Sequence, residues 1–496
     1  MNTTIQTALK TMIAVGTLTV PTAAGARNIG QKPNIVFFLV DDLGWADLPL
    51  YGNKFNETPH LDKIARKSVC FSNAYAASPV SSPTRASILS GQYPARLGMV
   101  DFIPGHWRPF EEVTVPVNRT QFMPENINTI GELLQKAGYK TGYFGKWHLG
   151  DSPAYHPLNQ GFDEANVGQG YFNTNFNPPR EQSSDKIISK RLTEFGCDFI
   201  EKNKDNPFFL FISHWDVHCP LDAEKPAITK YLRKPTIPGY PCNAVYAAMV
   251  ENIDSSAGQI IEKLKKSGVF DNTIFIFFSD NGGIITENKY PGISEEMMPM
   301  IAASKSEMYN DSSLRYVVTT NAPLRSQKGT LYEGGIRVPL IIHWPAKIKK
   351  GRVSDALVCS VDFYPTLLGV AGVGSQEKQP IDGKSLLPVV FENKYDSERA
   401  VYWHYPVYHH DVPAAAIRKG SWKLKENLVT GEPELYNLEI DIGESTDLSA
   451  VFPAKTNEML TLLKAWQKEL KAEFPTVNPD FDAERRFVWG YRPNNE

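Results

Sequence analysis

The chain is long, ordinary in composition and close to neutral. It has 496 residues, of which 42% are hydrophobic and 22% charged, and its formal net charge is −3. This composition excludes a disordered chain and is sufficient for a large core, divided between two domains. Because the chain has no basic surplus, we do not expect nucleic acid or a strongly anionic membrane as a partner. Any anion-binding site must therefore be local.

The N-terminus has the pattern of a secretory signal peptide. Lys10 precedes an apolar run over residues 12–24, and Ala24-Gly25-Ala26 offers a small-residue cleavage site. We predict a signal peptide over residues 1–26 and export to the periplasm, with the cell surface or the exterior as alternatives. The apolar run is too short to cross a membrane, so no transmembrane segment is expected. The five cysteines lack metal-type spacing, although export permits a disulfide.

Apolar runs alternate with amphipathic helices along the first two thirds of the chain. Continuous apolar runs predict buried strands over residues 34–40, 139–144, 208–213, 273–278 and 338–343. Helices are predicted over 129–137, from the capping-box spacing of Thr129 and Glu132, and over 243–266, from apolar periodicity. The alternation is typical of an α/β sandwich around a large, mixed but mostly parallel sheet.

The pattern changes after about residue 390. Short strands are predicted over residues 400–405, 414–425 and 434–438, followed by a helix over 454–474. We predict a smaller C-terminal α+β subdomain with an antiparallel sheet over 391–496, and a catalytic domain over 27–390. The aperiodic stretch from Glu287 to Ser313 is interpreted as a long excursion that shapes substrate binding.

Charged residues follow directly after the predicted strands. They include Asp41, Lys146, His218 and Asp280. Ligands of open α/β sheets bind beyond the carboxyl ends of the strands, so we expect these side chains to converge on one cleft. Asp41-Asp42 and Asp280-Asn281 supply hard oxygen ligands, which suit calcium or magnesium and not zinc. Either pair alone is better explained by a helix cap or a tight turn, and only the two pairs together with Ser81 in its motif favour a metal site.

The segment Ser81-Ser82-Pro83-Thr84-Arg85 is the most informative motif. Pro83 suits the first turn of a helix that ends at Gly91, which places residue 81 at the positive end of that helix, where an anion is favoured. Arg85 lies one turn further and could orient residue 81. Taken alone, Ser-x-Pro-x-Arg occurs by chance in about one of ten chains of this length, and a serine-capped surface helix explains it slightly better.

The ordered series of motifs resembles the formylglycine-dependent, type I sulfatases of the alkaline phosphatase superfamily, in particular the serine-type bacterial carbohydrate sulfatases. The resemblance spans most of the chain. It rests on Asp41-Asp42, Ser81 to Arg85, Gly145 to Gly150, His218, Asp280 to Gly283, and Lys328 before Glu333-Gly334-Gly335. It implies an alkaline-phosphatase-like fold and the hydrolysis of sulfate esters.

The resemblance also implies roles for the residues of these motifs. Residue 81 would be converted to formylglycine (3-oxoalanine), whose hydrate attacks sulfur. The ligands of one calcium ion would be Asp41, Asp42, Ser81, Asp280 and Asn281. Arg85 and His148 would support the hydrate. The residues that bind sulfate and protonate the leaving alcohol would be Lys146, His218 and Lys328.

A serine at position 81 resembles the substrates of anaerobic-type sulfatase-maturating enzymes. The resemblance therefore implies such an enzyme as a partner, and near inactivity of unmodified Ser81.

A sulfated glycan is the expected substrate. Candidate sugar contacts are Asp101, His106 and Trp107 after the motif helix, and His404, His409, His410 and Arg418 in the C-terminal part. The segment from Arg96 to Gly105 resembles exo-acting bacterial glycan sulfatases and favours a galactose or N-acetylgalactosamine 4-O-sulfate, with glucosamine sulfates as an alternative. Two other functions stay open: a phosphonate or phosphate monoester hydrolase of the same superfamily, and a non-catalytic sulfoglycan-binding protein with unconverted Ser81.

Overall fold

The computed structural model describes residues 32–181, 186–285, 317–374 and 379–490, all within one compact unit. The predicted signal peptide and the predicted excursion at 287–313 lie outside the described residues. In the part that the structure describes, no helix combines the length and the apolar character needed to cross a membrane. All five cysteines are free, so the disulfide that export would permit is not formed.

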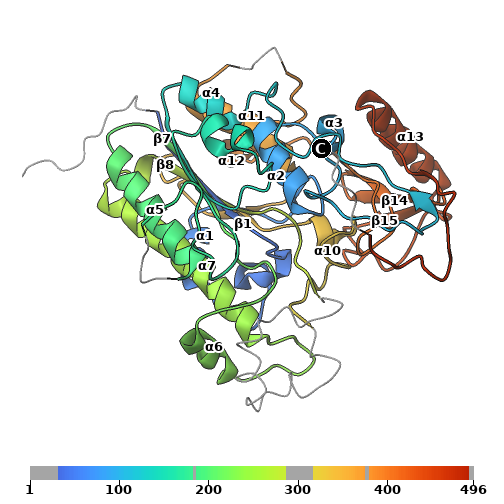
Figure 1. The fold of residues 1–496 in the computed structure, drawn as a ribbon, viewed down its shortest axis with the longest axis horizontal. Helices are drawn as coiled ribbons and strands as arrows, with labels where there is room; N and C mark the ends of the chain where they lie inside the picture. Colours follow the sequence, from blue (N-terminus) through green and yellow to red (C-terminus); the bar gives the residue numbers. More distant parts are fainter. Residues whose placement is uncertain (1–31, 182–185, 286–316, 375–378, 491–496) are drawn as a thin grey trace, which may run out of the picture. The chain divides into compact units, whose positions relative to one another are not determined.

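An eight-stranded sheet lies at the centre of this unit (Figure 1). Its strands in spatial order are β10 (Arg352–Ser354), β2 (Val69–Phe71), β9 (Leu340–His343), β8 (Thr273–Ser279), β1 (Asn34–Val40), β7 (Phe208–Ser213), β5 (Lys140–Gly145) and β6 (Glu164–Val167). Neighbouring strands are parallel, except that β9 pairs antiparallel with both β2 and β8. The predicted mixed, mostly parallel sheet is therefore confirmed.

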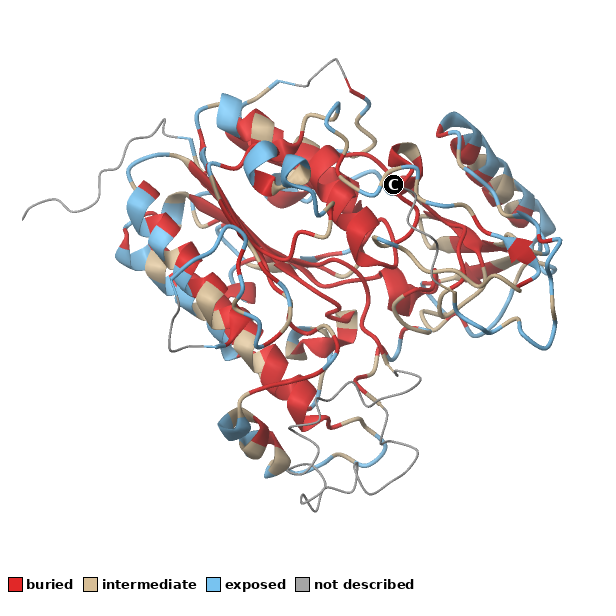
Figure 2. Cartoon of the chain, in the orientation of Figure 1, coloured by how far each residue is buried: buried red, intermediate tan, exposed pale blue. Residues whose placement is uncertain are grey.

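Helices cover both faces of this sheet (Figure 1). One face carries α1 (Pro59–Ala65), α5 (Ile188–Asn203) and α7 (Ala244–Lys266), with α6 (Lys225–Leu232) packed on α7; the other carries α2 (Ser81–Ser90), α4 (Ile130–Lys136), α11 (Phe363–Ala371) and α12 (Leu387–Glu392). Successive strand residues point to opposite faces, so Phe38 of β1 joins the first core and Phe37 the second. Figure 2 shows these strands buried throughout, which explains their continuous apolar sequences.

Shorter elements complete this part of the chain. They are α3 (Pro94–Leu97), α10 (Glu333–Ile336), the pair β3 (Ala74–Tyr75) and β11 (Val358–Cys359), the pair β4 (Val113–Thr114) and β16 (Thr476–Val477), and the 3-10 helices Trp45–Asp47, Pro49–Tyr51, Pro153–Tyr155, Pro157–Asn159, Phe270–Asn272 and Ser360–Asp362. The capping box predicted before α4 is present. The backbone N–H of Thr129 donates to Glu132, and the Thr129 hydroxyl accepts from the Glu132 N–H.

The C-terminal part forms a separate antiparallel sheet. Its strands are β12 (Ala400–Tyr405), β13 (Ala414–Lys419), β14 (Trp422–Asn427) and β15 (Pro433–Asn437), with α13 (Pro453–Glu469) packed against them. The single strand predicted over 414–425 was wrong, because Gly420, at φ 57°, turns the chain between β13 and β14. The helix ends at Glu469, short of the predicted 474, and Lys471 just beyond it has φ 55°. The domain boundary near 390 stays a prediction.

Candidate active site

The carboxyl ends of β1, β5, β7 and β8 form one edge of the large sheet. The strands lie in the order β8, β1, β7, β5, and all run in the same direction. The backbone N–H of Asp280 donates to the carbonyl of Val40, and that of Lys146 to the carbonyl of Ser213. The sheet thus brings together the charged residues that the sequence places after each strand.

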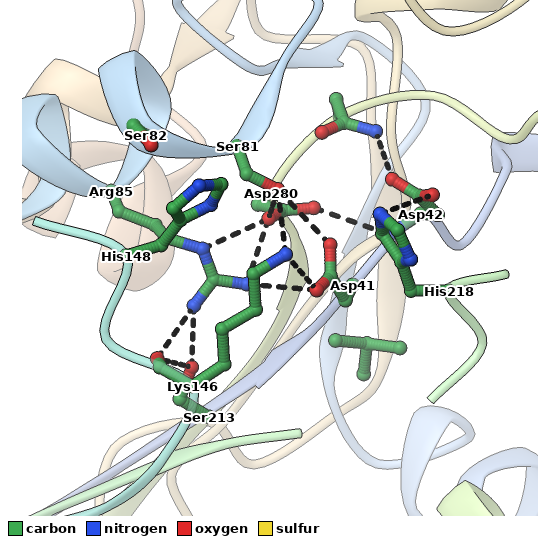
Figure 3. Close-up of polar contacts among 12 residues, drawn as sticks. Asp41, Asp42, Ser81, Ser82, Arg85, Lys146, His148, Ser213, His218 and Asp280 are labelled. Atoms are coloured by element: carbon green, nitrogen blue, oxygen red, sulfur yellow. Dashed lines mark hydrogen bonds and ion pairs between the residues drawn. The ribbon is translucent and has the colours of Figure 1, made fainter. Parts of the chain in front are cut away.

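Ser81 is the first residue of α2 and points into this edge (Figure 3). Its Oγ lies 3.0 Å from Asp41 Oδ1, 2.6 Å from Asp280 Oδ2 and 3.4 Å from Lys146 Nζ. Every residue of α2 is buried, so the alternative of a serine-capped surface helix is wrong. A serine hydroxyl has only one proton to donate, so it cannot satisfy both carboxylates that enclose it. This is an unusual environment for an inert serine.

Arg85 holds the carboxylate that Ser81 contacts. Its Nε and Nη2 both donate to Asp280 Oδ2, at 3.0 and 2.8 Å, and its Nη1 donates to the carbonyl of Lys146 and to Ser213 Oγ. Arg85 therefore acts on residue 81 through Asp280 and makes no direct hydrogen bond to it. Ser213 was missed in the sequence, although as the last residue of β7 it obeys the same strand-end rule.

Acidic and basic side chains balance one another at this edge. Lys146 Nζ lies 2.5 Å from Asp41, and Lys328 Nζ 2.8 Å from Asp42. Burial would raise the pKa of Asp41, but Lys146, His218 and Arg85 lower it below its ordinary value. At Asp42, burial would likewise raise the pKa, but Lys328 and His218 lower it below its ordinary value. Both carboxylates are therefore ionised near neutral pH.

Two histidines flank the charged residues. His148, at φ 58°, has Nε2 at 2.6 Å from the carbonyl of Ile103, and its buried Nδ1 has no hydrogen-bond partner among the described residues. Burial and Lys146 lower the pKa of His148 well below its usual value. His218 has Nδ1 at 2.5 Å from the Cys219 carbonyl and Nε2 at 3.6 Å from Asp42, and burial and Lys328 lower its pKa (Figure 3).

The oxygen donors fit a hard divalent cation. Ligand atoms of Asp41, Asp42 and His218 lie within 4.8 Å of one another. Asn281 donates from Nδ2 to Asp42 Oδ1, but its buried Oδ1 accepts no hydrogen bond within the described residues. A buried amide oxygen without a partner is costly unless a cation or water satisfies it. Carboxylate and amide oxygens are the ligands that calcium and magnesium prefer.

The loop after α3 carries the first three predicted sugar contacts. Asp101 is buried and accepts the backbone N–H groups of Phe102 and His106, so it shapes the loop. His106 stacks on Trp489, with ring centroids 4.3 Å apart, and lies 4.7 Å from the ring of His409. Trp107 is half-buried and pairs through its backbone with Gly490.

This loop contacts the reactive helix directly. The Ile103 N–H donates to Ser82 Oγ at 3.1 Å, and the Ile103 carbonyl faces His148. On the other side, His410 Nδ1 lies 2.6 Å from the carbonyl of Lys328. Aromatic rings therefore adjoin the charged edge. Trp489, which the sequence analysis missed, belongs to an apolar triplet near the end of the chain that could have signalled a role.

His404 and Arg418 do not lie with these residues. His404 is 5% exposed, with its two ring nitrogens near the carbonyl of Glu473 and the side chain of Gln467. Arg418 is 6% exposed and donates to the hydroxyl of Tyr75. This placement argues against the predicted sugar contact for both, because their polar groups are enclosed within the protein.

Comparisons with known proteins give a consistent result. Residues 33–373 match the sulfatase family, and residues 326–473 match the C-terminal family of N-sulphoglucosamine sulphohydrolase. Human N-acetylgalactosamine-6-sulfatase is 32% identical over 404 residues, which cover 77% of this chain and 70% of that protein. A sulfatase of Formosa agariphila is 30% identical over an alignment of 527 positions, gaps included, which covers 89% of each chain.

Solved structures share the fold. The structure of Ps i-CgsB in complex with k-i-k-neocarrahexaose has a TM-score of 0.71 and 29% sequence identity, and the match covers 88% of this chain and 93% of that one. The resemblance seen in the motifs is confirmed by these matches. The chain belongs to the sulfatase family, whose members hydrolyse sulfate esters.

Proposed function

We propose that this sulfatase removes sulfate from the sugars of a glycan, using a formylglycine formed from Ser81 and one calcium ion. The observation that carries the proposal is the position of Ser81 Oγ, between Asp41 and Asp280 and next to Lys146. When present, the hydrated aldehyde supplies a nucleophilic hydroxyl, and calcium held by Asp41, Asp42, Asp280 and Asn281 supplies positive charge next to it.

The side chains around Ser81 would bind and orient the anionic ester. Lys146 and Lys328 would face the sulfate oxygens, because both ammonium groups lie within ion-pair distance of the carboxylates at this edge. Arg85 would hold Asp280 in place through its ion pair. His148 would accept a hydrogen bond at Nδ1 from residue 81, since Nε2 faces the carbonyl of Ile103.

His218 would supply the proton to the departing alcohol. Without substrate, burial lowers its pKa, and Nδ1 faces the Cys219 carbonyl, which leaves Nε2 without a proton. A bound sulfate ester brings negative charge beside the ring and favours the protonated form. Nε2 would then hold the proton that the leaving oxygen requires.

We propose a galacto-configured sugar, with the 4-O position as the expected site of sulfate. The names of two relatives support the sugar: one acts on N-acetylgalactosamine 6-sulfate, and another was solved with k-i-k-neocarrahexaose. His106 and the Arg108 guanidinium, 4.2 Å from the ring centre, cover the faces of Trp489. The indole is still 43% exposed, so its open edge supports a sugar-contacting surface.

A panel of defined sulfated sugars tests the substrate. Galactose and N-acetylgalactosamine carrying sulfate at position 4 or 6, and the corresponding glucosamine sulfates, would be compared by kcat/KM. The highest value is expected for a 4-O-sulfated galacto sugar; a preference for glucosamine sulfates would contradict the proposal. Matched aryl sulfate and aryl phosphate esters separate it from the phosphate hydrolase alternative, which predicts dominant phosphate turnover.

Truncation of Trp489 tests the aromatic surface. Trp489→Ala should raise KM for a sulfated disaccharide by roughly two- to tenfold, with little change for a small aryl sulfate. Phe487→Ala, which truncates a neighbour that is 69% exposed, is the control. Equal effects of Trp489→Ala on both substrates would show that the ring only maintains the fold.

Maturation and export have separate tests. Intact-mass analysis of protein co-expressed with an anaerobic-type sulfatase-maturating enzyme should show the loss of two hydrogens at residue 81. A protein that keeps Ser81 unmodified, and that binds a sulfated glycan without hydrolysing it, would favour the sulfoglycan-binding alternative.

Cell fractionation should place the protein in the periplasm, without residues 1–26.

A further inference from the structure

A cavity of about 620 Å³ lies far from the active site. It is formed by α1, the second half of α7, the 3-10 helix Phe270–Asn272 and the segment after β9. This segment follows His343, which pairs with Phe275 near the start of β8. Since Ser81 and its partners lie beyond the carboxyl end of β8, the cavity is at the opposite edge of the sheet.

The walls of the cavity are apolar and its rim is basic. Ile64, Ile261, Ile348 and the ring of Phe270 line it. The rim carries four lysines, Lys63, Lys67, Lys265 and Lys349, against two acidic residues, Glu262 and Asp271. Within the described residues, only Lys265 of these lysines forms an ion pair, at 3.7 Å from Glu262. This local positive excess stands in a chain whose net charge is −3.

One buried polar atom of the cavity has no partner. His343 lines it, is 3% exposed, and its Nε2 accepts or donates no hydrogen bond within the described residues. Ser68 Oγ lies 2.7 Å from the carbonyl of Ile64 and 3.0 Å from His343 Nδ1. A carbonyl only accepts, so the Ser68 proton goes to Ile64 and His343 Nδ1 donates to Ser68 Oγ.

This arrangement fixes what a ligand must offer. Burial lowers the pKa of His343 to about 4, so the ring is neutral at neutral pH and Nε2 is an acceptor. An occupant that reaches this enclosed nitrogen must therefore donate an O–H or N–H to it. It must also cover apolar walls, including the Phe270 ring 5.3 Å from His343, and place negative charge at the lysines.

We propose that this cavity is a binding site for a small organic anion that has an apolar ring and a hydroxyl donor. The ligand's hydroxyl bonds His343 Nε2, its ring packs against Phe270 and Ile64, and its anionic group lies among Lys63, Lys67 and Lys349. The site is independent of the sulfatase reaction, because none of these residues contacts the active site.

Calorimetric titration with 4-hydroxyphenylacetate tests the site. Saturable 1:1 binding with a dissociation constant below about 1 mM is expected. Two analogues each remove one feature: 4-methoxyphenylacetate lacks the donor, and 2-(4-hydroxyphenyl)ethanol lacks the charge. Each should bind roughly two- to tenfold more weakly. The absence of saturable binding, or equal binding of all three compounds, overturns the proposal.

Variants locate the binding. Ser255→Trp, at an exposed position of α7 on the cavity wall, should abolish binding, whereas Thr461→Trp, at an exposed position of α13, should not. Lys349→Gln should weaken binding by roughly two- to fivefold, and Lys350→Gln, its exposed neighbour outside the cavity, should leave it unchanged. Binding that survives Ser255→Trp but is lost in Lys328→Gln would place the anion in the active site and refute the proposal.

Discussion

This protein has two buried clusters of ion-paired residues, one with a proposed catalytic role and one with a structural role. The active-site cluster comprises Asp41, Asp42, Asp280, Arg85, Lys146 and Lys328. The Glu333 cluster comprises Glu333, Glu444, Arg337, Arg418 and Lys423. All these side chains are largely or fully buried, so burial of ionic groups alone does not distinguish a reactive site from a structural one.

The Glu333 cluster is held together by ion pairs among its own members; Glu444 Oε1, which accepts no hydrogen bond within the described residues, still lies 2.8 Å from Lys423 Nζ. Glu333 contacts Lys423 at 2.9 Å, Arg337 at 3.2 Å and the Tyr75 hydroxyl at 2.6 Å, and its backbone N–H donates to Glu444. Lys423 belongs to β14 of the small sheet, whereas Tyr75 belongs to β3, so the contacts join the C-terminal part to the rest of the unit. Each cation has a fixed carboxylate, as a structural network requires.

The active-site cluster differs because it contains buried polar atoms that could still bind a ligand. Asn281 Oδ1 and His148 Nδ1 are buried without partners within the described residues, and a hydroxyl lies between two carboxylates. Incomplete satisfaction of buried polar groups, next to a potential nucleophile, is therefore the feature that separates the reactive cluster from the structural one.

The largest expected effect comes from removing the reactive residue. Ser81→Ala should lower kcat for an aryl sulfate by at least about 10⁴-fold, because the nucleophile is lost. Ser82→Ala, one residue along the same helix, is the matched control and should lower kcat by less than about tenfold. Both variants should fold, with Ser82→Ala less stable by about 1 kcal/mol because the Ile103 N–H loses its acceptor. Comparable loss in the two would show that helix α2, and not residue 81, is what activity requires.

Chelation should affect only the active-site cluster. EDTA is expected to lower activity by more than about 100-fold, and calcium should restore it. Calcium at 100 times its dissociation constant should also stabilise the fold by about 2.7 kcal/mol, seen as a higher unfolding temperature. Asp42→Asn should reduce that rise, whereas Glu333→Gln should preserve it. A rise in the unfolding temperature with zinc but not with calcium would contradict the assignment of a hard-cation site.

Breaking the Glu333 cluster should reduce stability and spare chemistry. Glu333→Gln leaves Arg337 and Arg418 without an ionised partner, whereas Lys423 keeps Glu444, and should lower the free energy of unfolding by about 3–5 kcal/mol in urea titration. Glu398→Gln, whose side chain is 75% exposed and 3.5 Å from Lys419, should change it by less than about 0.5 kcal/mol. A change in kcat of more than about tenfold in folded Glu333→Gln would mean that the two clusters are coupled.

The smallest effect is a pH dependence. Burial would raise the pKa of Glu333, but Lys423, Arg337 and Arg418 lower it from 4.5 to about 2. The unfolded chain thus binds this proton first as the pH falls, so the stability from Glu333 is complete above 4.5 and is lost toward 2. Wild-type and Glu333→Gln urea midpoints should differ most near neutral pH and converge on acidification. A constant difference would show that Glu333 stabilises by shape and not by charge.

Local sequence determined the elements that carry the site. Continuous apolar runs marked β1, β7 and β8, because a strand buried on both faces is apolar along its length and carries polar side chains only at its ends. The charged residues that end these runs then had to lie at one edge of a parallel sheet. Where the pattern was misread, as at Gly420, a single residue with positive φ reversed the chain.

The tertiary structure decided which residues share the site. Sequence order placed His404 and Arg418 among the sugar contacts, but packing enclosed both. It also brought Trp489 onto His106 and Ser213 onto Arg85, across separations that no local pattern records. The sequence by itself determined the chemistry available at the strand ends, since residue type and period are local properties. Only the fold decided which of those groups remain unpaired, because that depends on contacts between segments far apart in the chain.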